Sequence, residues 1–178
     1  MTVKVDASDF ATLARALNGL PGEIKVKAIS RALRRVGEMA RTQIVRKAAA
    51  DSGMRVGDVR SKTLLFNAGG GTAEIIMRSD WWPLFKLGGA RQTKTGVTVR
   101  NWGSHAGAFV GGLKSGHQGV FRRVGASRLP IRELWGPNPV AEIHQDEPAY
   151  EALLAEVAAT HLAPRILHEV DRLLARMA

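Results

Sequence analysis

Apolar residues recur at every third or fourth position between residues 23 and 50, which is the spacing of one face of an α-helix. The apolar positions are Ile24, Ala28, Leu33, Val36, Ala40 and Ile44. At 1.5 Å per residue, the predicted helix is roughly 40 Å long. Gly37 lies inside it and is expected to weaken the helix by about 1 kcal/mol without breaking it. A shorter helix is predicted before it, beginning at the capping residue Ser8 and ending at Asn18-Gly19.

After residue 63 the apolar period changes, and residues 64–125 are predicted to be β-rich. TLLFNA and TAEIIMRS, on either side of the glycines at 69–71, are typical of an antiparallel hairpin. A second hairpin is expected around Thr95-Gly96, and GAFVGGL and QGVFRRVG are predicted strands joined by the loop KSGH. DSGMRVGDVRSKT favours a turn and a short helix. SDWWPLFKLGG favours an irregular segment, because Pro83 lacks a backbone donor.

Residues 148–178 return to a helical period, and Pro164 is expected to kink or split this last helix near Leu162. The order helix, sheet, helix predicts an α+β fold. Its parts are a long N-terminal helix and a C-terminal helix packed on a small antiparallel β-sheet, with an extended proline-rich arm. With 178 residues the chain is expected to form a single domain. Its segments are a helical part (1–63), a β-rich part (64–125), the arm (126–147) and the C-terminal helix (148–178).

Charge is unevenly distributed along the chain, whose formal net charge is +10. Residues 1–63 carry a net charge of +7, residues 64–143 a net charge of +6, and residues 144–178 a net charge of −3. A basic body with an acidic end can attract a polyanion such as DNA, or it can pair head to tail with further copies of the same chain. Charge by itself leaves both alternatives open.

The composition and the N-terminal sequence exclude several kinds of site and location. There are no cysteines, which excludes disulfides and thiolate metal sites. The sequence MTVKVDASDF lacks the pattern of a signal peptide, and no apolar stretch approaches the roughly 18 residues of a membrane span. We therefore expect synthesis in the cytoplasm and no membrane partner.

No group of residues argues for catalysis or for a cofactor. GGLKSGHQG departs from a phosphate loop, because Leu113 stands where that motif needs glycine, and a glycine-rich hairpin loop is predicted instead. His161 and His168 fall on one helical face, but none of the five histidines has metal-ligand spacing, and surface or boundary positions are predicted. No nucleophile elbow is found. We expect no catalytic, cofactor-binding or metal-binding residues and no enzyme.

Arginines of the long helix form a candidate basic surface. It consists of Arg31, Arg34, Arg35, Arg41 and Arg46. Such side chains serve either as a solvated or subunit-contacting surface or as contacts with a DNA backbone. Because no zinc finger, homeodomain or RNA-binding strand pattern is found, sequence-specific binding is not expected. Weak, salt-sensitive contact with DNA stays open.

The stretch RRVGASRLPIRELWGPNPV, residues 122–140, combines prolines and arginines with bulky apolar residues. Proline fixes the backbone and disfavours long regular structure, so we expect a stiff, extended arm. Leu129 and Trp135 add apolar bulk to it. The arm can lie across its own domain as a strap, or it can dock on a neighbouring subunit, where Trp and Arg make the strongest anchors.

The motifs ARQTKTGVTV, GVFRRVG and SRLPIRELWGPNP, in this order, resemble the minor tail protein Z family of long-tailed bacteriophages and prophages. The similarity extends from about Phe10 to Val140 and includes the long basic helix. RLPI followed by GP is its most specific part. This block and the tryptophan beside it form the candidate subunit interface, Arg128, Leu129, Pro130, Ile131, Trp135, Gly136 and Pro137.

The resemblance implies a structural virion protein that completes the tail near its head-proximal end. It implies a ring of identical subunits, commonly six, that contacts the tail tube, the tail terminator and neck proteins and takes part in head–tail joining. DNA would pass through the lumen of this ring, where non-specific contact with it is open. The arm would reach a neighbouring subunit, because heterologous contacts close into a ring. The alternative is a basic DNA-binding accessory protein, whereas a hydrolase or nuclease has no supporting residues.

Overall fold

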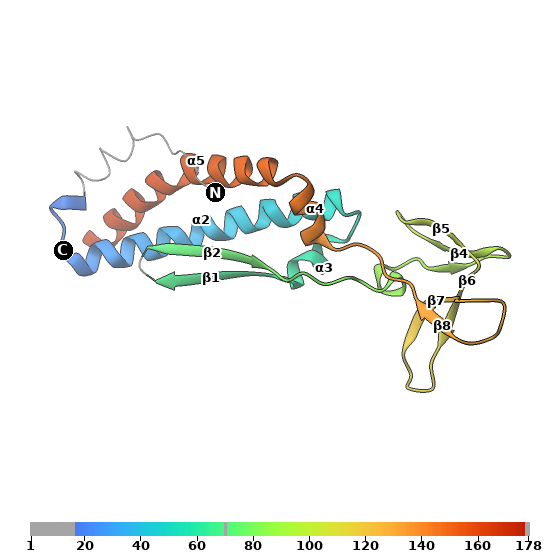
Figure 1. The fold of residues 1–178 in the computed structure, drawn as a ribbon. Helices are drawn as coiled ribbons and strands as arrows, with labels where there is room; N and C mark the ends of the chain where they lie inside the picture. The colour runs from blue at the N-terminus through green and yellow to red at the C-terminus, as the bar shows by residue number, and fades with distance from the viewer. Residues whose placement is uncertain (1–16, 70, 177–178) are drawn as a thin grey trace. The chain divides into compact units, whose positions relative to one another are not determined.

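The computed structural model describes residues 17–69 and 71–176 (Figure 1). The short helix predicted from Ser8 lies almost entirely outside these residues. Contacts divide the chain into two compact units. Unit 1 comprises Met1–Lys47, Arg60–Arg78 and Ile143–Ala178, and unit 2 comprises Ala48–Val59 and Ser79–Glu142. The expectation that residues 1–178 act as a single domain stays a prediction.

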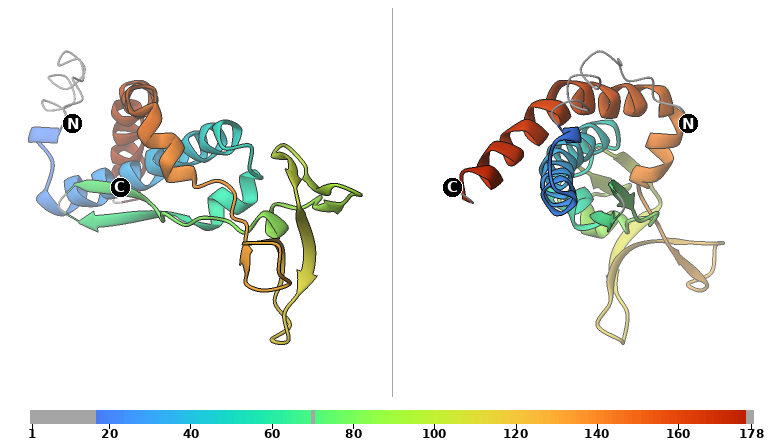
Figure 2. Two further views of the ribbon diagram at one scale, coloured as in Figure 1. Left: turned by 45° about the vertical axis from the view of Figure 1, so that its right-hand side comes forward. Right: turned by 90° about the vertical axis from the view of Figure 1, so that its left-hand side faces the viewer.

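Two long helices form most of unit 1. Helix α2 spans Gly22–Asp51 and helix α5 spans Glu147–Leu174, and the two lie alongside each other in Figures 1 and 2. Both helices were predicted from the sequence to within a few residues. The short helix predicted after α2 is α3, Val56–Ser61. Helix α4, Pro139–Gln145, was not predicted and falls inside the segment expected to be an extended arm.

Small side chains on α2 allow α5 to pack closely against it. Ala28 and Ala32 are fully buried in a cluster with Ile166 and Val170. A second cluster consists of Val36, Ala40 and Val157. Early residues of α2 thus meet late residues of α5, so the two helices are antiparallel. The apolar stripe predicted for α2 is buried except at Leu33, which is half-buried.

The first predicted hairpin is confirmed and packs on the helices of unit 1. It consists of β1, Thr63–Gly69, and β2, Thr72–Met77. A Cβ atom added at Gly37 of α2 would lie 2.8 Å from Leu65 Cδ1 of β1. Ile75 of β2 packs against the second helix cluster. Gly37 lowers the intrinsic stability of α2, but because it has no side chain, β1 can approach the helix closely.

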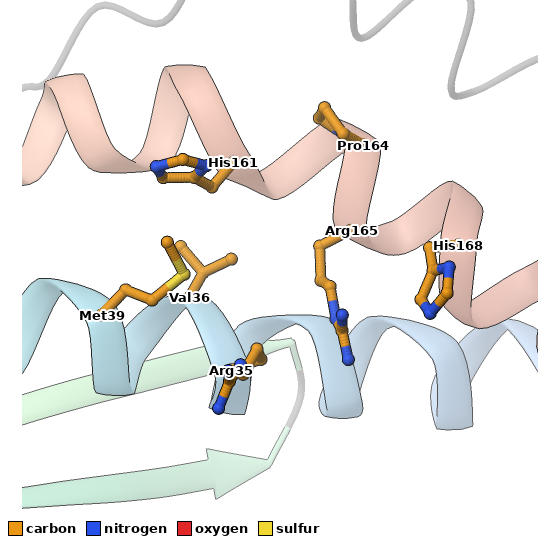
Figure 3. A pocket seen from close by; sticks show the side chains of 7 residues that line it. All are labelled: Arg35, Val36, Met39, His161, Pro164, Arg165 and His168. Atoms are coloured by element: carbon orange, nitrogen blue, oxygen red, sulfur yellow. The ribbon is translucent and has the colours of Figure 1, made fainter.

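Helix α5 continues through Pro164. The expected kink is visible as a change in the direction of the helix at this residue (Figure 3), whereas the helix is not split. Proline bends a helix because it lacks a backbone donor and its ring clashes with the preceding turn. Leu162 and Ala163, just before the bend, pack against the first helix cluster, which keeps α5 against α2 there.

Unit 2 contains two three-stranded antiparallel sheets. One has the order β3 (Arg91–Gln92), β4 (Gly96–Val99), β5 (Gly103–Ala106). The other has the order β6 (Ala108–Gly112), β7 (Gln118–Arg123), β8 (Ile131–Glu133). A 3-10 turn, η1 (Leu84–Leu87), contacts β4 and β7 and buries its two leucines.

The β-rich part was predicted correctly except for two strands. The hairpin around Thr95-Gly96 is β3–β4, and the strands on either side of KSGH are β6 and β7. Strand β5 reads GSHA, which has no apolar alternation, and β8 is a three-residue strand directly after Pro130. Neither gives a local strand signal, because each is fixed by the strand beside it. The fold is α+β, as expected.

Candidate functional site

The segment predicted as an extended arm is paired within unit 2 over part of its length. Strand β8 lies beside β7. Farther along, the Gly136 N–H donates to the Trp82 carbonyl over 2.6 Å, and the Trp82 N–H donates to the Pro137 carbonyl over 3.2 Å. From Pro139 the chain is helical, since proline is favourable in the first turn of a helix. The range 126–147 is therefore not extended throughout.

Most of the candidate interface residues remain accessible in unit 2. Leu129 is 67 % exposed and Trp135 is 53 % exposed. Arg128 and Pro130 are also exposed, and Ile131 is half-buried. Both side chains are therefore available to a partner, and exposed apolar surface that forms a contiguous patch is typical of contact sites.

Gly136 and Pro137, the other two candidates, are buried inside unit 2. A Cβ atom at Gly136 would lie 2.8 Å from Leu87 Cδ1 and 3.0 Å from Leu84 Cδ2, both in η1. Only glycine allows the segment to lie this close to η1. These two residues therefore position the exposed ones, and they have little surface of their own to offer a partner.

Trp81 is an exposed aromatic residue that was not singled out from the sequence. Its side chain is 60 % exposed. Pro83 is directly opposite Trp135 in an antiparallel bridge, and Trp81 precedes Pro83 by two residues. The bridge and the backbone hydrogen bonds of Trp82 bring the segment that contains Trp81 beside the segment that contains Trp135. In the sequence, the two consecutive tryptophans before Pro83 were the pattern that could have indicated this exposed residue.

The five arginines of the candidate basic surface do not form one group. Arg41 is largely buried, with Nη1 3.3 Å from Glu38 Oε2, and Arg31 Nη1 lies 3.9 Å from Glu169 Oε2. The other three, Arg34, Arg35 and Arg46, are exposed and form no ion pair within the described parts of the chain. Their charge is therefore available to a partner.

A hollow of about 370 Å³ lies between α2 and α5 in unit 1 (Figure 3). Its charged and titratable side chains are Arg35 from α2 and His161, Arg165 and His168 from α5. Val36, Met39 and Pro164 complete it. The structure thus brings Arg35, predicted on the basic surface, together with the two histidines that were predicted to share a helical face.

A second hollow, of about 530 Å³, adjoins the first and shares Arg35 and Met39 with it. It adds Arg46 from α2 and Arg60 from α3. Glu38 is its single acidic residue, and this carboxylate already pairs with an arginine. Basic side chains therefore predominate in both hollows.

One carboxylate is buried beside these basic side chains. Glu169 on α5 is 2 % exposed, and its oxygens lie 2.7 Å from Arg165 Nη2, 3.8 Å from Arg172 Nη1 and 3.9 Å from Arg31 Nη1. Arg31 belongs to α2, so Glu169 links the two helices electrostatically. Three arginines around one carboxylate leave an excess of positive charge at this end of the helix pair.

The remaining candidate chemistry is structural. The glycine-rich loop between β6 and β7 is a hairpin turn, in which the Leu113 N–H donates to the His117 carbonyl over 2.8 Å. His117 Nε2 lies 2.9 Å from Glu133 Oε1 and joins β8 to this loop. Among residues 17–69 and 71–176, no cluster of His, Asp and Glu is arranged to hold a metal ion. No helix in the described part of the chain is apolar and long enough to cross a membrane.

Comparison with known proteins identifies the family. The model of the family "Prophage minor tail protein Z (GPZ)" matches residues 11–177, nearly the whole chain. No curated protein and no solved structure matches the sequence. The match includes both units and the candidate interface, as the sequence motifs led us to expect, and it extends beyond Val140, where the resemblance of the motifs ended, to include α5. The chain belongs to the prophage minor tail protein Z family.

Proposed function

We propose that this protein forms a ring at the head-proximal end of a phage tail, where it completes the tail and joins it to the head. Membership of a minor tail protein family makes it a structural tail protein of a phage, with a place in the virion and contacts to other virion proteins. A family of this kind also favours a protein without enzyme activity. The family match over nearly the whole chain is the observation that carries the proposal.

Exposed apolar side chains support assembly into a closed ring. A ring needs two different surfaces on each subunit, because every contact joins one surface to another on the next copy. Unit 2 offers Trp81, Leu129 and Trp135 as one such surface. Unit 1 offers the outer face of the β1–β2 hairpin, where exposed Leu64 lies directly opposite exposed Ile76. We assign these surfaces to contacts between subunits or with the tail tube, terminator and neck proteins.

Point substitutions test the ring better than deletion of the arm. Residues 131–137 are paired with the rest of unit 2, so their removal would expose its core. We expect the variant Leu129→Ala/Trp135→Ala to have the same circular dichroism spectrum as the unmodified protein, because both side chains are more than half exposed. The loss of these anchors should shift the protein from rings to smaller species. Light scattering and electron microscopy, with and without tail-tube protein, measure this shift.

Leu113→Ala is the matched control, because Leu113 is an exposed leucine of unit 2 in the β6–β7 loop. The control should assemble like the unmodified protein. A protein that is monomeric in every condition, with or without tail-tube protein, would contradict ring formation. If rings persist in the double variant, the interface between subunits lies outside residues 128–137.

A second candidate function, contact with the DNA that passes the tail, is favoured by the unpaired arginines of α2. Arg34, Arg35 and Arg46 are exposed and carry no counter-charge within the described residues. The acidic residues of the early part of α5 on the next copy are the alternative partner for this charge. Affinity for duplex DNA that decreases steeply with salt supports the DNA alternative, and no affinity at low salt contradicts it.

A further inference from the structure

Four basic side chains occupy one face of α5. They are His161, Arg165, His168 and Arg172, at relative positions 0, 4, 7 and 11. At 3.6 residues per turn these positions fall on one side of the helix. The row is about 16 Å long at 1.5 Å per residue. Only the two histidines of this row stood out in the sequence, and surface or boundary positions were predicted for them.

Helix α2 adds arginines opposite this row. Arg35 lines one hollow together with His161, Arg165 and His168, as Figure 3 shows. Arg31 approaches the same side of α5, since its Nη1 lies 3.9 Å from Glu169 Oε2. The second hollow continues the positive surface to Arg46 and Arg60. Helices α2, α5 and α3 therefore provide two adjoining basic hollows, which together we call the α2–α5 groove.

The groove has an unfilled hydrogen-bond donor as well as excess charge. Nε of Arg165 is buried and has no acceptor within the described residues, although Nη2 of the same side chain reaches Glu169 over 2.7 Å. A buried donor without an acceptor is unfavourable, and a ligand with anionic oxygens would satisfy it. Within the described residues, Glu169 Oε1 and Glu38 Oε2 each accept a hydrogen bond from another nitrogen of an arginine, and no carboxylate oxygen accepts from Arg165 Nε.

We propose that the α2–α5 groove binds the phosphodiester backbone of duplex DNA, through Arg35, Arg165, His161 and His168. Arginine suits phosphate because its planar donors match two phosphate oxygens. The row on α5 is long enough to meet several successive phosphates, which are spaced by about 3.4 Å along the axis of each strand. The inference rests on the part of the proposed function in which DNA passes the protein. It does not depend on the ring.

Duplex DNA fits the groove better than two other polyanions do. Single strands are held by stacking of bases on aromatic rings, whereas the lining contains no Trp, Tyr or Phe. The acidic residues in the early part of α5 on a second copy form no matching row. Glu147 and Glu151 share one face of α5, but Glu156 lies more than a third of a turn away from Glu151. Backbone contact also agrees with the lack of any base-reading motif in the sequence.

The charged groups around His161 and His168 come from both helices. They are Arg31 and Arg35 from α2, and Arg165, Glu169 and Arg172 from α5. Arginines outnumber the single carboxylate among them, which favours an anionic ligand.

The test measures fluorescence anisotropy of a labelled duplex of about 20 base pairs over a salt series. Arg35→Glu should weaken binding by at least about tenfold at moderate salt. Its control is Lys114→Glu, which changes the net charge equally at an exposed position of the β6–β7 loop. The control should lose much less affinity. Because Arg35 is exposed and unpaired, we expect both variants to fold normally.

A second pair of variants tests the histidines. His161→Gln/His168→Gln should weaken binding of the duplex, because both histidines line the hollow together with Arg35 and Arg165. His144→Gln, at an exposed position on α4, should bind like the unmodified protein. Equal losses in Arg35→Glu and Lys114→Glu would show that only total charge matters, and would overturn the proposal.

A competitor distinguishes DNA from an acidic protein partner. Polyglutamate that displaces the duplex as effectively as unlabelled DNA at equal charge would assign the groove to an acidic protein surface and overturn the proposal. Light scattering on the same samples separates this inference from ring formation. Arg35→Glu should form the same oligomer as the unmodified protein. Loss of DNA binding with intact rings therefore supports DNA binding by the groove. Loss of rings without loss of DNA binding does not support it.

Discussion

Glu169→Gln should destabilise unit 1, because the buried carboxylate holds three arginines near the contact between α2 and α5. The substitution keeps the size of the side chain and one acceptor for Arg165, but it removes the negative charge. Arg31 and Arg172, whose Nη1 atoms lie 3.9 and 3.8 Å from Glu169 Oε2, lose their counter-charge. The three arginines then repel one another without compensation.

The size of the effect follows from these distances and from the burial of Glu169. At an effective dielectric constant of about 20, opposite charges 4 Å apart attract each other by roughly 4 kcal/mol. Burial of the carboxylate costs several kcal/mol, which offsets most of the gain from the three arginines. The arginines are a third to a half exposed, so water can solvate them in the variant. We expect a net loss of about 2 kcal/mol, or a decrease in Tm of about 4–8 °C.

Far-UV circular dichroism during thermal and urea unfolding measures this loss, because α2 and α5 contain most of the helix and lie almost entirely in unit 1. The control is Glu156→Gln on the same helix, since Glu156 is exposed. Its Tm should stay within about 1 °C of the unmodified protein. An unchanged Tm for Glu169→Gln, or an equal decrease in the control, would refute the electrostatic link between the helices.

Two further substitutions test the packing of each unit. Gly96→Ala should destabilise unit 2 by about 1–3 kcal/mol, because the new Cβ would lie 2.9 Å from the carbonyl carbon of His105 and force β4 and β5 apart. Tryptophan fluorescence reports this, since all four tryptophans lie in unit 2, and an unchanged urea midpoint would contradict it. Lys47→Ala should cost unit 1 about 0.5–1 kcal/mol, because it removes a 3.0 Å contact with Asp146 and a cation–π contact with a tyrosine ring. Circular dichroism in low and high salt checks this effect, which should be smaller in high salt.

The spacing of apolar residues along the chain predicted those helices and strands that are specified by their own sequence. The apolar spacing gave α2 and α5, and the alternation around glycine turns gave β1–β2, β3–β4 and β6–β7. Strands β5 and β8 were missed, because GSHA and a three-residue strand after Pro130 become strands only through their neighbours. The segment before α5 was expected to be extended, and proline instead begins α4 at Pro139.

The candidate site was only partly accessible to sequence reasoning. The sequence indicated Leu129 and Trp135 as bulky residues on a stiff segment, and both are exposed. It could not show that Gly136 is buried against η1 or that the segment before Pro83 pairs with the segment around Trp135, because both facts depend on contacts between segments about fifty residues apart. The basic surface was predicted on α2 alone, whereas its hollows also require α5 and α3.

The sequence by itself determined the α+β class, the positive charge and the family, because composition, periodicity and short motifs are properties of neighbouring residues along the chain. Only the tertiary structure decided which charges are free and which are neutralised. Arg31, Arg35 and Arg41 look alike on one helix, but Arg31 meets a buried carboxylate from α5, Arg41 pairs within α2, and Arg35 faces a hollow with two histidines. Side chains that are more than a hundred residues apart interact only after the helices pack, and that packing determines the groove.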